Sequence, residues 1–167
     1  MPDLPPTERL QPCLLDRLTD NEPGKKTESR DNRVLSLQQY RRAVLRDLSW
    51  LLNTMRGKDE ELISSSAIAD SVLNYGIRDL TGLNAEALSI HQLEREILAA
   101  IKRFEPRIMP DTLRVRGEDR SSSEGTGHLY FEITGTLWAR PMPEELDIQT
   151  EVDLGTGRIE VRTQSHG

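Results

Sequence analysis

The sequence predicts an α+β fold: three helices packed on one face of a four-stranded antiparallel sheet, with a flexible N-terminal segment. Over residues 36–104 the apolar residues recur every three or four positions, the period of a helix with one buried face. From residue 112 onward they alternate in twos, as strand residues do. The period changes at Glu105-Pro106-Arg107, because Pro106 lacks an amide donor and disfavours a helical Glu105. We expect this tripeptide to join a helical half to a β half.

Residues 1–35 are expected to be flexible. Four prolines stand among the first twelve residues, and residues 25–33 are charged with no apolar period, which is typical of a linker. Between them lies an isolated apolar hexamer, residues 13–18, which is either one docked helical turn or a short linear motif that binds elsewhere. Docking on the protein's own body or on an assembly partner is favoured over exposure to solvent. The leucines that would share one side of this turn are Leu14, Leu15 and Leu18.

Each helix of the main domain has local start or stop signals. The first is expected over residues 36–55, with Ser36 and Gln39 as a capping box and a stop at Gly57. A short second helix is expected over residues 64–74. The third begins at residue 90, with Ser89 as N-cap and Gln92 as its capping-box partner, and ends at Glu105.

Four strands are expected in the β half, at residues 112–116, 129–139, 146–154 and 158–163. The first two are joined by residues 117–127, which contain no apolar residue and are expected to be mobile. A tight turn, Gly155-Thr156-Gly157, joins the last two as a hairpin. Residues 36–163 should therefore form a single domain, followed by a disordered tail over residues 164–167.

Composition excludes several classes of function. The chain of 167 residues has 22 basic and 28 acidic residues, a net charge of −6, and no basic stripe, which argues against a nucleic-acid partner. We expect no membrane insertion and a cytoplasmic protein, because neither an apolar run of about 18 residues nor a secretory leader is visible. Cys13 is the single cysteine, so no internal disulfide is expected.

No metal ion and no cofactor are predicted. The three histidines, His91, His128 and His166, are far apart and lack the spacing of metal ligands. The glycines of residues 155–157 precede a strand rather than a helix, which favours a turn over a phosphate-binding loop.

One catalytic hypothesis concerns Glu105. A two-carboxylate glycosidase could use Glu105 as general acid with a second carboxylate such as Asp111. Only 4% of the residues are aromatic, which leaves few side chains to line a sugar-binding cleft. The favoured interpretation has no catalytic residue: Arg107 orders the helix-to-strand joint or a partner's surface.

Four segments, in this order, resemble the TssE baseplate subunits of bacterial type VI secretion systems, a family related to the small baseplate wedge protein of contractile phage tails. Glu-Pro-Arg is the signature of that family. The segments are LLDRLTDNEP at residues 14–23, SLQQYRRAVLRDLSWLLNT at 36–54, SVLNYGIRDLTG at 71–82 and FEPRI at 104–108.

The resemblance implies a structural subunit rather than an enzyme. It implies a place in the baseplate wedge with TssF and TssG, with TssK as a further partner, and docking of the first ring of the TssB/TssC sheath by β-strand addition. Six copies are expected in a baseplate docked at the inner membrane, each monomeric when alone. The alternative, from the family's "lysozyme-like" label, is a peptidoglycan-cleaving glycosidase that uses Glu105. The site residues expected for assembly are Glu105, Pro106 and Arg107 at the joint, Leu14, Leu15 and Leu18 for N-terminal docking, and Ile159 and Val161 on the edge strand for the sheath.

Overall fold

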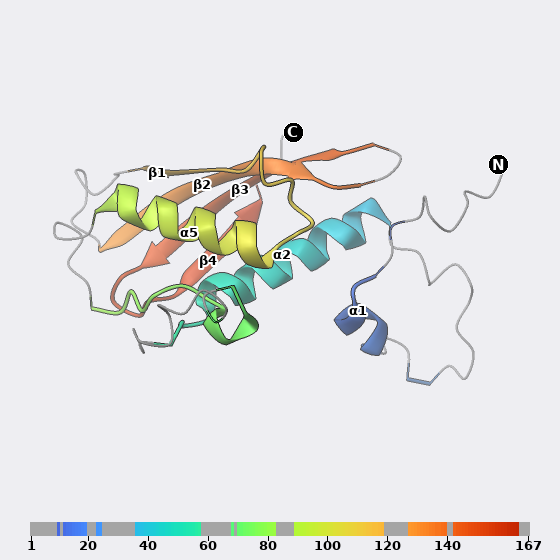
Figure 1. Cartoon of the computed structure of the whole chain (residues 1–167), viewed down its shortest axis with the longest axis horizontal. Coiled ribbons are helices and arrows are strands. Elements are labelled where there is room, and N and C mark those ends of the chain that lie inside the picture. Colours follow the sequence, from blue (N-terminus) through green and yellow to red (C-terminus); the bar gives the residue numbers. More distant parts are fainter. Residues whose placement is uncertain are drawn as a thin grey trace.

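The computed structural model describes residues 10, 12–19, 23–24, 36–57, 68, 70–82, 89–118, 127–139 and 142–163. The helices precede the strands along the chain, so the predicted α+β class is confirmed (Figure 1). In order, the elements are α1 (Leu14–Leu18), α2 (Leu37–Asn53), the 3-10 helix η3 (Val72–Asn74), α5 (Ile90–Phe104), β1 (Arg114–Glu118), β2 (His128–Leu137), β3 (Glu144–Asp153) and β4 (Ile159–Thr163).

The sheet is an antiparallel meander with the strand order β1-β2-β3-β4. In the register, Ile133 of β2 stands between Val115 of β1 and Ile148 of β3, so apolar residues of neighbouring strands share one face. β1 and β4 are the two edge strands. The hairpin predicted between β3 and β4 is present, and Gly157 adopts a positive φ of 72° in its turn, a conformation that favours glycine.

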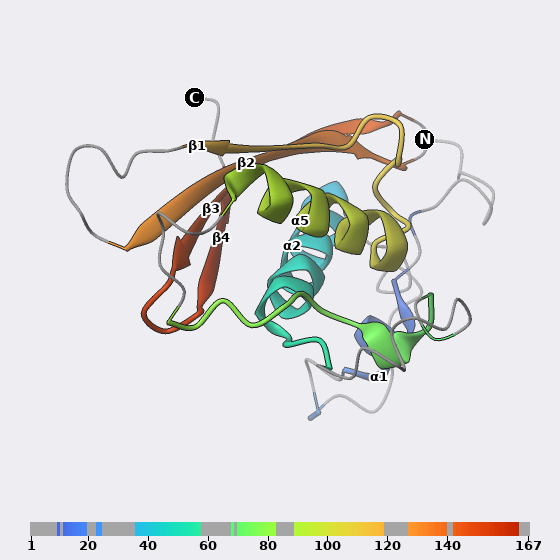
Figure 2. The same ribbon diagram turned by 60° about the vertical axis from the view of Figure 1, so that its left-hand side comes forward.

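α2 and α5 cover the apolar face of the sheet, and the core lies between these two layers (Figure 2). The core-facing residues follow the predicted periods, and burying each large apolar side chain contributes roughly 1.5–3 kcal/mol. Fully buried examples are Leu48 and Leu51 of α2, Leu93, Ile97 and Ile101 of α5, Phe131 and Ile133 of β2, and Ile148 of β3.

Helix ends follow the local signals in part. The capping box of α2 is confirmed: the Gln39 amide donates to Ser36 Oγ at 3.2 Å, and the Ser36 amide donates to Gln39 Oε1 at 2.8 Å. Ser89 is the N-cap of α5, as predicted, and accepts from the backbone amide of Gln92. The reciprocal bond of the predicted capping box is not found, and the Gln92 side chain donates to Glu96 Oε1 at 3.2 Å instead. The predicted end of α2 is wrong by two residues, because the helix stops at Asn53 and the next residues form a parallel bridge, Met55 with Ile77.

Two other predictions need correction or lie outside the described residues. β1 extends through Gly117 and Glu118 into the predicted loop, because the Gly117 amide donates to Glu94 Oε1 of α5 at 2.7 Å and glycine leaves room for Ile90. Of the helix predicted over residues 64–74, the described end is η3, whose Val72 is 80% exposed rather than packed. The remainder of that helix, apart from residues 68 and 70–71, lies outside the described residues, as do residues 119–126, the tail at 164–167 and most of residues 1–35.

Candidate assembly sites at the helix-to-strand joint and the sheet edge

The tripeptide Glu105-Pro106-Arg107 forms the joint between α5 and the sheet. Glu105 is the C-cap residue of α5, and its amide donates to the Ile101 carbonyl at 2.9 Å. The Arg107 carbonyl accepts from the Trp138 amide at 2.7 Å, so the joint is bonded to the residue that follows β2. The change of period in the sequence therefore marks the joint correctly.

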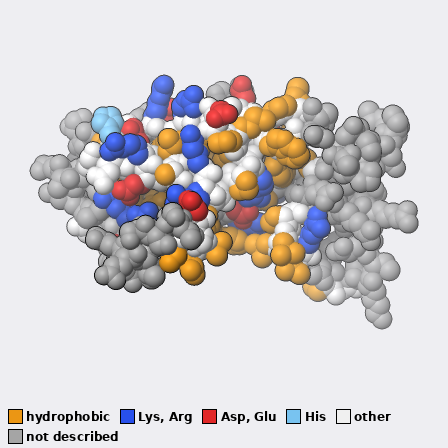
Figure 3. Space-filling model, viewed as in Figure 1, with side chains coloured by type: hydrophobic (Ala, Val, Ile, Leu, Met, Phe, Trp, Pro, Cys, Tyr) orange, Lys and Arg blue, Asp and Glu red, His pale blue; other side chains and the backbone are white. Residues whose placement is uncertain are grey.

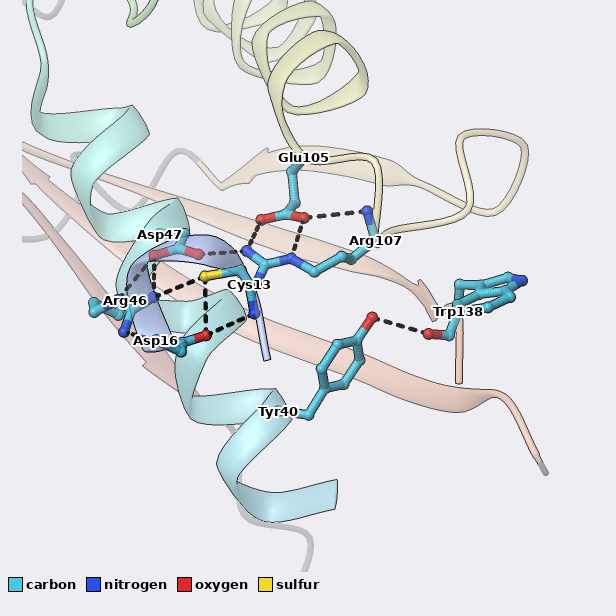
Figure 4. Close-up of polar contacts among 8 residues, drawn as sticks. All are labelled: Cys13, Asp16, Tyr40, Arg46, Asp47, Glu105, Arg107 and Trp138. Carbon is cyan, nitrogen blue, oxygen red and sulfur yellow. Dashed lines mark hydrogen bonds and ion pairs between the residues drawn. The ribbon is translucent and has the colours of Figure 1, made fainter. Parts of the chain in front are cut away.

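Glu105 is 3% exposed and is held by Arg107 (Figure 4). The Arg107 amide and Nε donate to Glu105 Oε1 at 3.1 and 2.7 Å, and Nη2 donates to Oε2. Arg107 Nη2 also donates to Asp47 Oδ2 of α2 at 2.6 Å. Burial disfavours the charged guanidinium, but the hydrogen bonds and negative charges of Glu105 and Asp47 outweigh it and raise the pKa of Arg107.

The contacts continue from Asp47 to the N-terminal helix. Arg46, the residue before it in α2, pairs with Asp47 Oδ1 at 2.8 Å and with Asp16 Oδ1 of α1 at 2.6 Å. We call the series Glu105–Arg107–Asp47–Arg46–Asp16 the ion-pair chain. It runs from the joint across α2 to α1 (Figure 4).

Asp16 closes the ion-pair chain and also organises α1. The amide and thiol of Cys13 both donate to Asp16 Oδ2, at 3.3 and 2.9 Å, which completes the N-terminal capping of this five-residue helix. Burial alone would raise the pKa of Asp16, but the hydrogen bonds from Cys13 and Arg46 and the charge of Arg46 outweigh it and lower the pKa.

The leucines of α1 point away from these contacts. Leu14, Leu15 and Leu18 are 73, 42 and 74% exposed, and α1 contains no buried residue. Hydrophobic side chains at α1 accordingly reach the surface (Figure 3). The sequence left docking on the body or on a partner open; α1 is attached to α2 by its polar side, and its apolar side is exposed.

Ile159 and Val161 lie on β4 with the alternation that the sequence predicts. Ile159 is 2% exposed and Val161 is half-buried, whereas Glu160 and Arg162 are exposed and pair with each other at 2.6 Å. β4 and the joint contact α2 at different places: Ile159 bonds to Asn53, the last residue of α2, whereas Arg107 bonds to Asp47 in its middle.

Three contributing residues were missed by the sequence analysis: Arg46, Asp47 and Asn53. Arg46 and Asp47 carry the ion-pair chain across α2. The Asn53 side chain bonds to the backbone of Ile159. Their partners are 30 to 106 residues away in the chain, so no local pattern indicates them.

The glycosidase hypothesis finds no support in the geometry at Glu105. Both of its carboxylate oxygens are occupied by Arg107, which leaves neither free to protonate a glycosidic oxygen. A cavity of about 310 Å³ lies elsewhere, against α5 and residues 74–77, and Phe104 is the one aromatic residue among the described residues that line it. Glu96, the carboxylate among these lining residues, is paired with Arg78 at 3.2 Å.

Among the described residues, no three His, Cys, Asp or Glu side chains are placed to share a metal ion. His91 instead contacts Glu94 at 2.9 Å, and His128 contacts Glu151 at 3.4 Å. Within the same part of the chain, no helix has the length and apolar character needed to cross a membrane.

Comparison with known proteins identifies the family of this chain. No curated protein matches the chain. A crystal structure named "putative tail lysozyme", from Geobacter sulfurreducens, is similar over 79% of this chain and 99% of that chain, with 18% sequence identity and a TM-score of 0.44. The family described as baseplate wedge protein gp25 matches residues 38–142, which include most of α2, the joint, β1 and β2. Because this match covers more than half of the sequence, the chain belongs to the gp25 family of baseplate wedge proteins.

Proposed function

We propose that the protein is the TssE subunit of a type VI secretion baseplate, a structural adaptor that joins the TssF/TssG wedge and docks the contractile sheath. Membership of the gp25 family supports a baseplate role. The segments at residues 14–23, 36–54, 71–82 and 104–108 support the assignment to TssE. In this role six copies act in the baseplate on the cytoplasmic side of the inner membrane, and each is monomeric before assembly.

The observation that carries the proposal is the attachment of α1. The ion-pair chain fixes its polar side to α2, while its three leucines are left exposed. Exposed clusters of large apolar side chains commonly mark protein interaction sites. TssF and TssG therefore bind the leucines of α1, with TssK as a further contact of the wedge.

Glu105, Pro106 and Arg107 contribute to this interface indirectly, because Arg107 bonds to Asp47 of α2. Arg107 is half-buried, and its guanidinium contacts Glu105 and Asp47 of the same chain. The joint thus sets the position of α2 relative to α5. α2 in turn holds α1 through the pair of Arg46 with Asp16. In this role the tripeptide is a structural element of the adaptor rather than a catalytic one.

The sheath binds at a second place, the outer edge of β4. An edge strand has unpaired amide and carbonyl groups that can bond an incoming strand whatever its side chains. Val161 and Ile159 provide the apolar side of β4, and the charges of Glu160 and Arg162 restrict pairing to a strand that matches them.

One preparation can separate the adaptor from the glycosidase. The purified protein is mixed with a TssF–TssG complex for co-purification, and in parallel is incubated with labelled peptidoglycan. We expect co-purification, no release of label above background, and the same null result for Glu105→Gln. Release by the wild type that Glu105→Gln abolishes would overturn the proposal, as would a wedge complex that assembles without this protein.

A further inference from the structure

The outer edge of β4 is not open along its whole length. Asn53, the last residue of α2, donates from Nδ2 to the Ile159 carbonyl at 2.8 Å and accepts the Ile159 amide on Oδ1 at 2.9 Å. The same Nδ2 donates to the Ser49 carbonyl at 2.8 Å, which fixes the side chain on its own helix. The amide of Asn53 therefore pairs with Ile159 as one peptide group of a neighbouring strand would.

The register of the hairpin shows which groups of β4 face outward. The Asp153 amide donates to the Arg158 carbonyl at 2.9 Å, so the backbone groups of Arg158 point toward β3. Successive residues of a strand direct their amide and carbonyl groups to opposite sides. Ile159, Val161 and Thr163 therefore direct theirs away from β3, and Ile159 is the one that Asn53 occupies.

We propose that Asn53 sets the register of the strand that adds to β4, by occupying Ile159 so that pairing with the incoming strand begins at Val161. A partner strand that pairs with Val161 and Thr163 meets no obstruction from Asn53. A strand shifted by two residues toward the hairpin turn would have to displace the Asn53 side chain and leave both groups of its amide to find new partners. The inference rests on the proposed docking of the sheath at β4 and names the residue that limits it.

Strand addition in general requires something that sets the register of the incoming strand, and Asn53 can do so. Backbone pairing alone specifies register weakly, since every residue of a strand offers the same groups. A fixed side chain at one position of the edge supplies the missing reference point. The partner implied is an extended segment with alternating side chains, apolar beside Val161 and complementary in charge beside Glu160 and Arg162.

Amide hydrogen exchange of the full-length protein can test both claims: that Asn53 occupies Ile159, and that the incoming strand pairs from Val161 onward. In the free wild type we expect the Ile159 amide to be protected and the amides of Val161 and Thr163 to exchange fast. In Asn53→Ala the protection of Ile159 should fall on the order of tenfold or more, because its amide loses its partner. Thr54→Ala is the matched control. Thr54 also donates to a carbonyl of the previous turn, that of Trp50 at 2.7 Å, but its other described hydrogen bonds are with Leu51 and Ile77 rather than with β4.

Purified TssB/TssC sheath subunits are then added to each protein. In the wild type, Val161 and Thr163 should gain protection and Ile159 should not change; in Asn53→Ala, Ile159 should gain protection as well. If Val161 and Thr163 gain nothing in the wild type, the sheath does not dock on β4, and the register role falls with it. If Val161 and Thr163 gain protection, the docking on β4 is supported. The role of Asn53 is then wrong if the Ile159 amide of free Asn53→Ala exchanges as slowly as in the wild type, or if it gains no protection when the sheath subunits bind.

A second variant keeps the test independent of any folding defect in Asn53→Ala. Asn53→Asp retains the acceptor for the Ile159 amide but has no donor for its carbonyl. Its Ile159 amide should therefore keep most of its protection when free. With the sheath subunits present, it should resist the register shift more than Asn53→Ala does. Equal behaviour of the two variants would contradict the proposal.

Discussion

Arg107 and Asp47 are 60 residues apart in the sequence, yet Arg107 Nη2 donates to Asp47 Oδ2 at 2.6 Å. The same guanidinium holds both oxygens of Glu105, so one side chain links the end of α5 to the middle of α2. The Glu105-Pro106-Arg107 joint is therefore bonded, through Arg107, to α2, the helix to which α1 is attached. From sequence, Arg107 could serve the joint or a partner; the contacts that the structure describes are those of the joint.

Arg107→Ala should destabilise the fold as well as impair assembly. The substitution leaves Glu105, 3% exposed, with a buried charge and no counter-ion, and removing one partner of a buried pair commonly costs about 3–5 kcal/mol. Urea denaturation followed by circular dichroism measures the change in the free energy of unfolding. We expect a lower midpoint with an unchanged slope.

Arg107→Lys is the control for that experiment. Lysine retains the charge but not the planar fork that contacts Glu105 and Asp47 together, so its loss of stability should be intermediate. A wild-type midpoint for Arg107→Ala, combined with failure to bind the wedge proteins, would instead place the main role of Arg107 in the interface.

Replacing Leu14, Leu15 and Leu18 by serine should abolish binding to TssF and TssG without unfolding the protein. All three side chains are at least 42% exposed, and surface substitutions usually change stability by less than about 0.5 kcal/mol. Co-purification and a thermal melt of the same sample measure the two effects. Leu37→Ser, at a leucine of α2 that is 43% exposed, as Leu15 is at 42%, is the control and should bind normally. A melting temperature much lower for the triple variant would mean that the leucines belong to the protein's own core.

The attachment of α1 should weaken in acid. The pKa of Asp16 is lowered in the folded protein from its ordinary value of 3.8, so its pairing stabilises α1 above about pH 4 and is lost as the pH falls through the lower, folded value. Arg46 keeps its charge throughout, because Asp16 and Asp47 raise its pKa despite burial. Protection factors of the α1 amides, which compare each measured exchange rate with the intrinsic rate at the same pH, should fall in this window, and Asp16→Asn should show little protection at any pH. A flat profile in the wild type would mean that the pair with Arg46 does not hold α1.

Local signals account for the elements that the sequence predicted well. The capping box at Ser36 and the interruption at Pro106 act within a few residues, so each can be read from a short stretch of chain. The alternation of β2 and β3 likewise reflects one buried face. These local features were sufficient to predict the fold class and the position of the joint.

The contacts that connect the elements could not be predicted in the same way. Asp47 and Asn53 are polar residues on an amphipathic helix, and nothing nearby in the sequence distinguishes them from solvent-facing neighbours. Their roles arise because α2 contacts Arg107 through Asp47 and Ile159 through Asn53, partners that are 60 and 106 residues distant in the chain. Residues of this kind are identified by the three-dimensional contacts, even where the family is evident from sequence.

Val161→Pro tests the docking of the sheath on β4. The backbone groups of Val161 face away from β3, in the alternation set by Arg158, so proline at this position removes an outward donor and no hydrogen bond of the β3–β4 ladder. Edge strands tolerate proline when its missing amide faces outward. We therefore expect a folded protein with normal binding to TssF and TssG but no sheath polymerisation, scored by sheath fluorescence in cells.

Two controls decide what a loss of sheaths means. Val161→Thr keeps the outward amide and the β-branched shape, so sheaths should form at the normal frequency if the backbone donor is what matters. Glu160→Pro removes an amide that faces β3, so it should lower the melting temperature where Val161→Pro does not, because it breaks the ladder itself. If Val161→Pro is folded and sheaths still grow at the wild-type frequency, strand addition at β4 is wrong. That outcome would remove the proposed sheath contact from β4 and leave the proposed wedge contacts of α1 untouched.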